Sequence, residues 1–173
     1  MLKYSSAEVL CPMVKDRINI TADNYFTVPF EMGQVVVHTS ANGCMTGIDF
    51  DLEGSFKAKR TSSTLGSDIR RYFEGHEVPW NFELDLDGLT DFTRRVYNRV
   101  SSIHYGQLST YGEIARDIGC SGGGRAVGQA MGSNRFPLIV PCHRVIAGNR
   151  AIGGFSSGIR LKQYLLQLEG VDL

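Results

Sequence analysis

The sequence has no apolar run long enough to cross a membrane, and its N-terminus has no apolar stretch typical of a signal peptide. We therefore expect no membrane partner and a cytoplasmic location, or a nuclear one in a eukaryote. No CxxC pair occurs among the four separated cysteines, so free thiols are expected and not a disulfide framework: Cys11, Cys44, Cys120 and Cys142. The four histidines supply no closely spaced ligand pairs, and no metal site is expected.

The net charge of the 173 residues is zero, but the two halves of the chain differ. Residues 1–91 contain 8 Lys and Arg against 14 Asp and Glu, a net charge of −6. Residues 92–173 contain 10 Lys and Arg against 4 Asp and Glu, a net charge of +6. The second half could therefore bind a polyanion, or the two halves could attract each other.

The first half is predicted to be an α/β lobe. Residues 35–40 and 44–53 flank Asn42-Gly43, a pattern typical of a β-hairpin. In its second strand the apolar and acidic side chains alternate between faces, with Ile48, Phe50 and Leu52 opposite Asp49, Asp51 and Glu53. A short amphipathic helix that ends at Gly75 is predicted from Leu65, Ile69, Tyr72 and Phe73. An acidic segment follows, and the predicted domains are residues 1–88 and 89–173.

The second half is predicted to be mainly helical, which makes the whole chain α+β. A first helix is indicated by Phe92, Val96, Val100 and Ile103. Thr110 and Glu113 form a capping box that begins a second helix, which ends near Gly119. A glycine-rich turn over 120–124 then leads into a third helix over 125–131, and this order predicts a helix-turn-helix.

The third helix has small residues on its outer face. Its outer positions are Arg125, Ala126, Gly128 and Gln129. Small residues let a helix backbone approach a surface closely, and a single projecting arginine suits the DNA minor groove. Tight packing against another helix would explain the same pattern.

The stretch PLIVPCHRVI, residues 137–146, reads as a buried strand that leads into a thiol, an imidazole and a guanidinium. Cys142 could be a nucleophile with His143 as its base, or a buried structural cysteine. A last helix is predicted over 159–169 with Leu161, Leu165 and Leu168 facing inward. Glu169 in its final turn opposes the helix dipole, so we expect another partner for it, such as the histidine of a Cys-His-acid relay.

The segment PCHRV at 141–145, preceded by RAVGQAM and SN, resembles the active-site signature of the O6-alkylguanine-DNA alkyltransferases, also called methylated-DNA–protein-cysteine methyltransferases. The resemblance covers about residues 89–170. It implies a ribonuclease-H-like N-terminal lobe and a helix-turn-helix that binds the minor groove of double-stranded DNA. It also implies DNA repair by direct reversal, in which a monomer without a cofactor transfers the alkyl group of O6-alkylguanine irreversibly to its own cysteine, once per molecule.

The resemblance implies a role for each matching residue. Cys142 would accept the alkyl group, His143 would be the water-linked base, and Glu169 would orient the histidine. Asn134 would brace the neighbouring turn, Tyr111 would donate to guanine N3, and Arg125 would replace the flipped nucleotide. The DNA-binding face would comprise Arg125, Ala126, Gly128 and Gln129, and the base pocket Tyr111, Val145, Phe155 and Ser156. The chain has Phe155-Ser156-Ser157-Gly158 where many relatives have Tyr-Ser-Gly-Gly.

Three other classes of protein share part of this pattern. A non-catalytic sensor of alkylated DNA usually has tryptophan in place of the cysteine, unlike Cys142. A helix-turn-helix regulator with a redox cysteine would need a base-reading helix, for which Ala126 and Gly128 are poor residues. A cysteine hydrolase would leave the helix-turn-helix unexplained.

Overall fold

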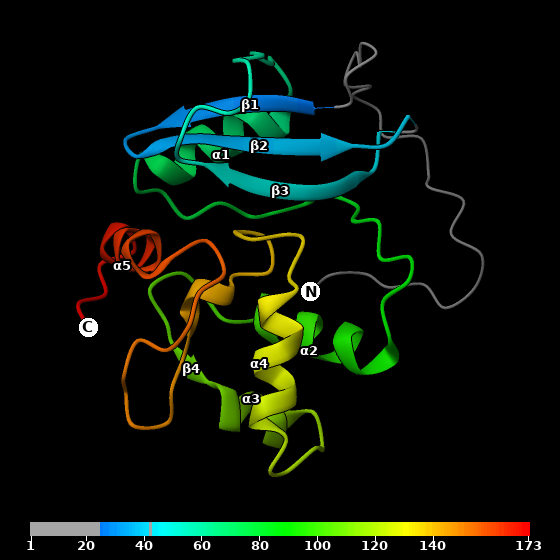
Figure 1. Cartoon of the computed structure of the whole chain (residues 1–173), viewed down its shortest axis with the longest axis vertical. Helices are drawn as coiled ribbons and strands as arrows, with labels where there is room; N and C mark the ends of the chain where they lie inside the picture. The colour runs from blue at the N-terminus through cyan, green and yellow to red at the C-terminus, as the bar shows by residue number, and fades with distance from the viewer. Residues whose placement is uncertain (1–24, 42) are drawn as a thin grey trace. The chain divides into compact units, whose positions relative to one another are not determined.

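The computed structural model describes residues 25–41 and 43–173, which form two compact units divided in sequence between Asp85 and Leu86. The first unit contains an antiparallel sheet and the second is mainly helical, so the α+β prediction is confirmed (Figure 1). Within the described ranges, no helix combines the length and the apolar character that a membrane span requires.

Three strands build the sheet of the first unit: β1 (Tyr25–Phe30), β2 (Gly33–Thr39) and β3 (Met45–Asp51). They pair antiparallel in the order β1-β2-β3, with Val35 opposite Phe50 and Val37 opposite Ile48. The predicted hairpin is therefore confirmed as β2 and β3, although Asn42 of its turn lies outside the described residues.

Helix α1 (Thr64–Phe73) packs against β1 and covers one face of the sheet (Figure 1). The Oγ atom of Ser63 accepts a hydrogen bond from Gly66 N at 3.2 Å and caps the start of the helix. Leu65, Ile69 and Tyr72 are buried, as their helical spacing predicts.

Asp51 is buried, because its carboxylate accepts hydrogen bonds from the Gln34 side chain at 2.8 Å and from Ser55 N and Phe56 N at 2.9 and 3.0 Å. One expectation is wrong, because Cys44 is disulfide-bonded and not a free thiol. Cys120 and Cys142 are free thiols, as expected, and Cys11 lies outside the described residues.

The second unit begins with α2 (Asp91–Ser101), which buries Val96, Tyr97 and Val100. Helix α3 (Tyr111–Asp117) follows the short strand β4 (Ser109–Thr110), and α4 (Gly124–Gly132) follows a turn. The predicted capping box is present, since Glu113 N donates to the Thr110 side chain at 3.1 Å and Thr110 N donates to the Glu113 carboxylate at 2.7 Å. Helix α2 packs against both α3 and α4, which also pack against each other.

The apolar run from Pro137 is a buried turn, so the predicted strand is wrong there. Val140 N donates to Phe136 O at 2.8 Å, and Leu138 has a φ of 77°, outside the extended region. A one-turn 3₁₀-helix (Cys142–Arg144) follows. Strand β5 (Val145–Ile146) then pairs in parallel with β4.

Helix α5 (Ile159–Leu168) completes the unit, with Glu169 as its C-terminal cap. Leu161 and Leu165 are buried as predicted. Leu168 is half-buried and Leu166 is buried in its place, together with Lys162. The inward face of α5 is therefore rotated from the predicted one and includes a charged residue.

Candidate active site

Asn134 fastens the two ends of the buried turn that precedes Cys142. Its Oδ1 atom accepts a hydrogen bond from Phe136 N at 3.0 Å, and its Nδ2 atom donates to Val140 O at 2.8 Å. The turn needs such support because the left-handed conformation of Leu138 costs about 1–3 kcal/mol. The Nδ2 atom also donates to Cys142 Sγ at 3.2 Å, so the residue that braces the turn contacts the sulfur as well.

Cys142 is the first residue of the 3₁₀-helix and its side chain is buried. Burial raises the pKa of the thiol because a thiolate is less well solvated there. The hydrogen bond from Asn134 and the positive charge of Lys162 act in the opposite direction, as do the backbone N–H groups of Cys142 and His143. The site thus shields the sulfur from water and directs several groups at it that stabilise its anionic form.

His143 and Glu169 form a fully buried pair. Nε2 of His143 lies 2.8 Å from Oε1 of Glu169, and neither side chain is exposed. Burial alone would raise the pKa of Glu169, but hydrogen bonds from His143 and Arg144 outweigh it and lower the pKa to about 2. Burial lowers the pKa of His143 despite the carboxylate beside it. The pair at neutral pH is therefore a neutral imidazole and a carboxylate.

The protonation states fix the role of each imidazole nitrogen. A carboxylate only accepts hydrogen bonds, so Nε2 of His143 must carry the proton that it shares with Glu169. In a neutral imidazole the other nitrogen, Nδ1, then has a free electron pair. His143 can therefore act as a base through Nδ1, and Glu169 keeps it in that tautomer.

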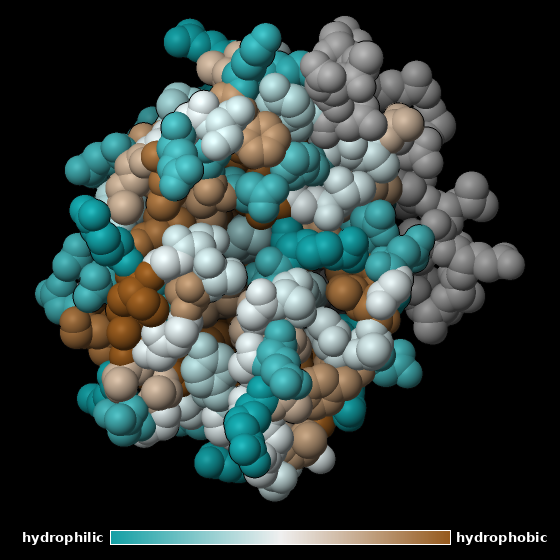
Figure 2. Space-filling model, viewed as in Figure 1, coloured by the Kyte–Doolittle hydropathy of each residue, from teal (hydrophilic) through white to brown (hydrophobic). Residues whose placement is uncertain are grey.

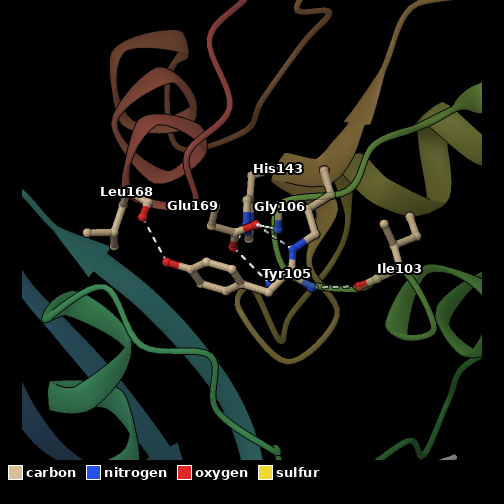
Figure 3. A network of polar contacts seen from close by, with 7 residues as sticks. Ile103, Tyr105, Gly106, His143, Leu168 and Glu169 are labelled. Atoms are coloured by element: carbon tan, nitrogen blue, oxygen red, sulfur yellow. Dashed lines mark hydrogen bonds and ion pairs between the residues drawn. The ribbon is translucent and has the colours of Figure 1, made fainter.

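Glu169 is held from two further directions (Figure 3). Arg144 donates from Nε to Oε2 at 2.8 Å and from Nη2 to Oε1 at 2.9 Å, and Gly106 N donates to Oε2 at 3.1 Å. The guanidinium is fixed in turn by a bond from Nη1 to Ile103 O at 2.6 Å. The Tyr105 hydroxyl donates to Leu168 O at 2.7 Å, one residue before the carboxylate. The loop after α2 and the end of α5 thus hold the carboxylate in place.

Lys162 is a buried residue of the site that the sequence analysis missed. Its Nζ atom donates to Val145 O at 2.6 Å and to Gly154 O at 3.3 Å. Burial lowers the pKa of Lys162 to about 8, while the charge of a Cys142 thiolate raises it. A signal was available, because Lys162 precedes Leu165 and Leu166 by three and four residues and so shares their helix face.

Tyr111 lies between α4 and the loop that precedes α5. A Cβ atom built on Gly124 or Gly128 would lie 3.8–3.9 Å from the Tyr111 side chain, and one built on Gly153 would lie 3.4 Å from its ring. The Tyr111 hydroxyl is 3.4 Å from Gly154 O. Burial raises the pKa of Tyr111, and a Cys142 thiolate raises it further. The phenol therefore stays protonated near neutral pH and can donate a hydrogen bond.

The other predicted pocket residues are less enclosed or already engaged. Val145 is buried, its N–H donates to Cys142 O, and its carbonyl accepts the bond from Lys162. A carbonyl oxygen can accept two hydrogen bonds, and the bond from Lys162 uses one of them at Val145. Phe155 is half-buried and Ser156 is exposed.

The outer face of α4 carries the four residues named from the sequence. Arg125 and Gln129 are exposed, and Ala126 and Gly128 are half-buried. Hydrophilic side chains lie among surface of neutral hydropathy over α4 (Figure 2). A Cβ atom on Gly128 would make an ordinary contact with the Tyr111 ring at 3.9 Å, so packing against residues 25–41 and 43–173 does not require glycine there.

The comparisons with known proteins agree with this arrangement. A family model described as "6-O-methylguanine DNA methyltransferase, DNA binding domain" matches residues 91–171. The methylated-DNA–protein-cysteine methyltransferase of Methanothermobacter thermautotrophicus is 41% identical over 129 residues, which is 70% of this chain and 72% of that protein. The protein of the same name from Mycobacterium tuberculosis is 46% identical over 101 residues, which is 58% of this chain and 61% of that protein.

Solved structures extend the likeness over most of the chain. The crystal structure of Mycobacterium tuberculosis OGT in complex with DNA has a TM-score of 0.73 and 36% identity, and the match covers 84% of this chain and 92% of that one. The O6-methylguanine-DNA methyltransferase from Pyrococcus kodakaraensis has a TM-score of 0.60 and 28% identity. The segment that matches the family model contains the buried Cys142 and the paired His143 and Glu169. The chain belongs to the methylated-DNA–protein-cysteine methyltransferase family.

Proposed function

We propose that this protein repairs alkylated DNA by direct reversal, transferring the alkyl group of O6-alkylguanine to Cys142. The main support is a buried cysteine that accepts a hydrogen bond from Asn134 and is followed directly by a histidine paired with Glu169 at 2.8 Å. This arrangement lies inside the segment that matches the family model. The proposed substrate is double-stranded DNA, and no cofactor is expected.

In the proposed reaction, the sulfur of Cys142 attacks the alkyl carbon as the bond from that carbon to guanine O6 breaks. The thiol proton leaves through His143 Nδ1, directly or through one water, and guanine takes up a proton as it departs. The Tyr111 hydroxyl donates toward guanine N3 and stabilises the developing negative charge. The product is a thioether, which thiol exchange does not reverse, so each molecule acts once.

The substrate base must leave the duplex before the sulfur can reach it, which costs a few kcal/mol. Helix α4 is proposed to enter the minor groove, with Arg125 filling the gap in the base stack. Ala126, Gly128 and Gln129 would complete this face, and their small or polar side chains suit the close approach of a helix backbone to DNA. Val145, Phe155 and Ser156 would contact the extruded base.

The proposal extends to the remainder of the chain. We assign residues 1–88 to a ribonuclease-H-like lobe, because three antiparallel strands followed by a helix match the beginning of that topology. Residues 89–173 would bind DNA and accept the alkyl group. The protein is expected to act as a monomer, in the cytoplasm or in a nucleus where the substrate occurs.

The mass of the intact protein, measured after incubation with a duplex containing O6-methylguanine, tests the proposal. One added methyl group per molecule is expected, and peptide mapping should place it on Cys142. Binding without a mass change would indicate a sensor, and a strong consensus sequence in a binding selection would indicate a regulator. Repeated turnover would contradict the single-use mechanism.

A further inference from the structure

The turn that follows β5 contains a residue in an unusual backbone conformation. Ala147 N donates to Ala151 O and Arg150 N donates to Ala147 O, both at 3.0 Å, which closes a tight turn. Arg150 has a φ of 62°, in the left-handed region where a Cβ atom crowds the backbone. Turns that end in this conformation favour glycine, and the arginine is therefore the less stable choice.

Leu138 is the other non-glycine residue with a positive φ in the described part of the chain, and the two residues differ in what offsets the strain. Leu138 is fully buried and its turn is fastened by Asn134. Arg150 is exposed, and its side chain has no hydrogen bond or ion pair with the described residues. Nothing within those residues compensates for placing arginine there, and strain of this kind is often retained for function.

The position of the turn connects it with the candidate active site. Three residues after Arg150, Gly153 lies against the Tyr111 ring, and Gly128 of α4 lies against the same ring. The loop over 147–154 and the first half of α4 therefore flank the same side chain. Arg150 belongs to this loop and lies three residues before the glycine that contacts the Tyr111 ring.

The charge of the surrounding sequence is of one sign. Residues 118–168 contain no Asp or Glu and six Lys or Arg, among them Arg125 and Arg150. An exposed guanidinium in this segment therefore has no carboxylate nearby in the sequence with which it could form an ion pair. A phosphate group of a nucleic acid suits it, because arginine matches phosphate oxygens in charge and geometry.

We propose that Arg150 binds a phosphate of the DNA backbone beside the extruded nucleotide, as a second cation that acts with Arg125. This inference rests on the proposed function. Glycine at position 150 would relax the turn and lose the phosphate contact. The arginine thus exchanges some stability of the fold for affinity toward DNA.

The test compares Arg150→Gly, Arg150→Lys and a control, Arg71→Gln, which removes one exposed charge from α1 of the other unit. Binding to an unmodified duplex is measured over a series of salt concentrations, and the melting temperature of each protein is recorded. Arg150→Gly should melt about 2–4 °C higher than the parent. Its binding should be about five- to tenfold weaker at 0.1 M salt, with a salt slope lower by about 0.9.

The two other variants separate the contact from the charge of the whole protein. Arg150→Lys should keep the salt slope, and Arg71→Gln should leave slope and affinity unchanged. Reaction with free O6-benzylguanine should be the same for all, because that substrate has no backbone. An unchanged slope in Arg150→Gly, an equal loss in Arg71→Gln, or a lower melting temperature in Arg150→Gly would overturn the inference. A parent protein that binds no duplex would overturn the proposed function itself.

Discussion

The charged groups beside Cys142 are buried, whereas the cations of α4 and of the loop over 147–154 are exposed. The two regions therefore differ in what stabilises each charge, which is a protein partner in the first and water in the second. The carboxylate of Glu169 accepts bonds from His143, Arg144 and Gly106, so its charge is matched within the unit. Arg125 and Arg150 are exposed and make no hydrogen bond or ion pair through their side chains with the described residues. A buried charge is costly without a partner, whereas an exposed one is solvated and remains available for binding.

This difference predicts that chemistry and DNA binding can be lost separately. Cys142→Ala should abolish alkyl transfer completely and leave duplex affinity close to that of the parent, since the thiol is buried and outside the proposed DNA-binding face. Intact-protein mass and a binding titration on the same sample would measure both. Cys120→Ser is the matched control and should react normally. Alkyl label on Cys120 would contradict the assignment.

Breaking the buried pair should have the next largest effect. His143→Ala removes the base and should slow transfer by roughly 10²–10⁴-fold, with a flatter dependence of the rate on pH. Single-turnover rates with O6-benzylguanine from pH 5 to pH 9 would show this.

Glu169→Gln should also slow transfer, but it leaves Arg144 without its carboxylate, which costs about 3–5 kcal/mol of stability. Its rates must therefore be measured where circular dichroism confirms folding. A normal rate in the folded Glu169→Gln protein would show that the carboxylate is structural.

A change on the exposed face should depend on the substrate. Arg125→Ala should raise the free energy needed to extrude the base by roughly 3 kcal/mol. This corresponds to about 10²-fold slower transfer from alkylated duplex. The same variant should react almost normally with O6-benzylguanine, which has no stack to leave. Parallel rate measurements on the two substrates test this. Equal slowing on both substrates would indicate that Arg125 supports the structure of the pocket and does not act in base extrusion.

Substitution of Lys162 is expected to have the smallest effect on the transfer rate. It should also change stability and reactivity in opposite directions. Its pKa of about 8 in the fold is below the ordinary 10.5, so its charge lowers the free energy of unfolding below about pH 8, and this cost disappears as the pH rises toward 10.5. Lys162→Met should stabilise the protein by about 1 kcal/mol at pH 7, after allowing for two lost hydrogen bonds. Transfer should slow about tenfold, because the Cys142 thiolate loses a nearby cation.

Urea unfolding at pH 7 and pH 9, together with rates on O6-benzylguanine, would test Lys162→Met. The stability gain should shrink at the higher pH. A variant that is less stable at pH 7 and equally reactive would mean that Lys162 serves the fold through its bonds to Val145 and Gly154.

Local signals in the sequence predicted the elements that local chemistry determines. The hairpin, α1 and the capping box of α3 are confirmed, because each depends on residues close together in the chain. The segment from Pro137 was misread, since its composition favours a strand and nothing local indicates a left-handed Leu138. That conformation depends on the clamp from Asn134 and on burial against the remainder of the unit.

Contacts between distant residues explain the other differences. From the sequence alone, a lysine is expected to point to solvent even beside an apolar helix face. Lys162 is buried because its ammonium group donates to the carbonyl of Val145, seventeen positions away. Asp51 alternates with apolar residues as a solvent-facing side chain would, but a later loop supplies Ser55 N and Phe56 N to its carboxylate. The pairing of Glu169 with His143 was anticipated from an unfavourable helix end and from resemblance, whereas Arg144 and Gly106 as further partners were not.

The support of Glu169 by the loop after α2 links the catalytic imidazole to the long-range folding of the unit. The bonds from Tyr105 to Leu168 and from Gly106 to Glu169 each join residues 63 positions apart, and contacts of such separation require the intervening chain to close into a long loop. The imidazole is therefore oriented only after both ends of the unit have come together. The orientation of the base at the thiol is therefore coupled to long-range folding of the unit, and a change that opens the loop after α2 would also release the catalytic imidazole from its fixed tautomer.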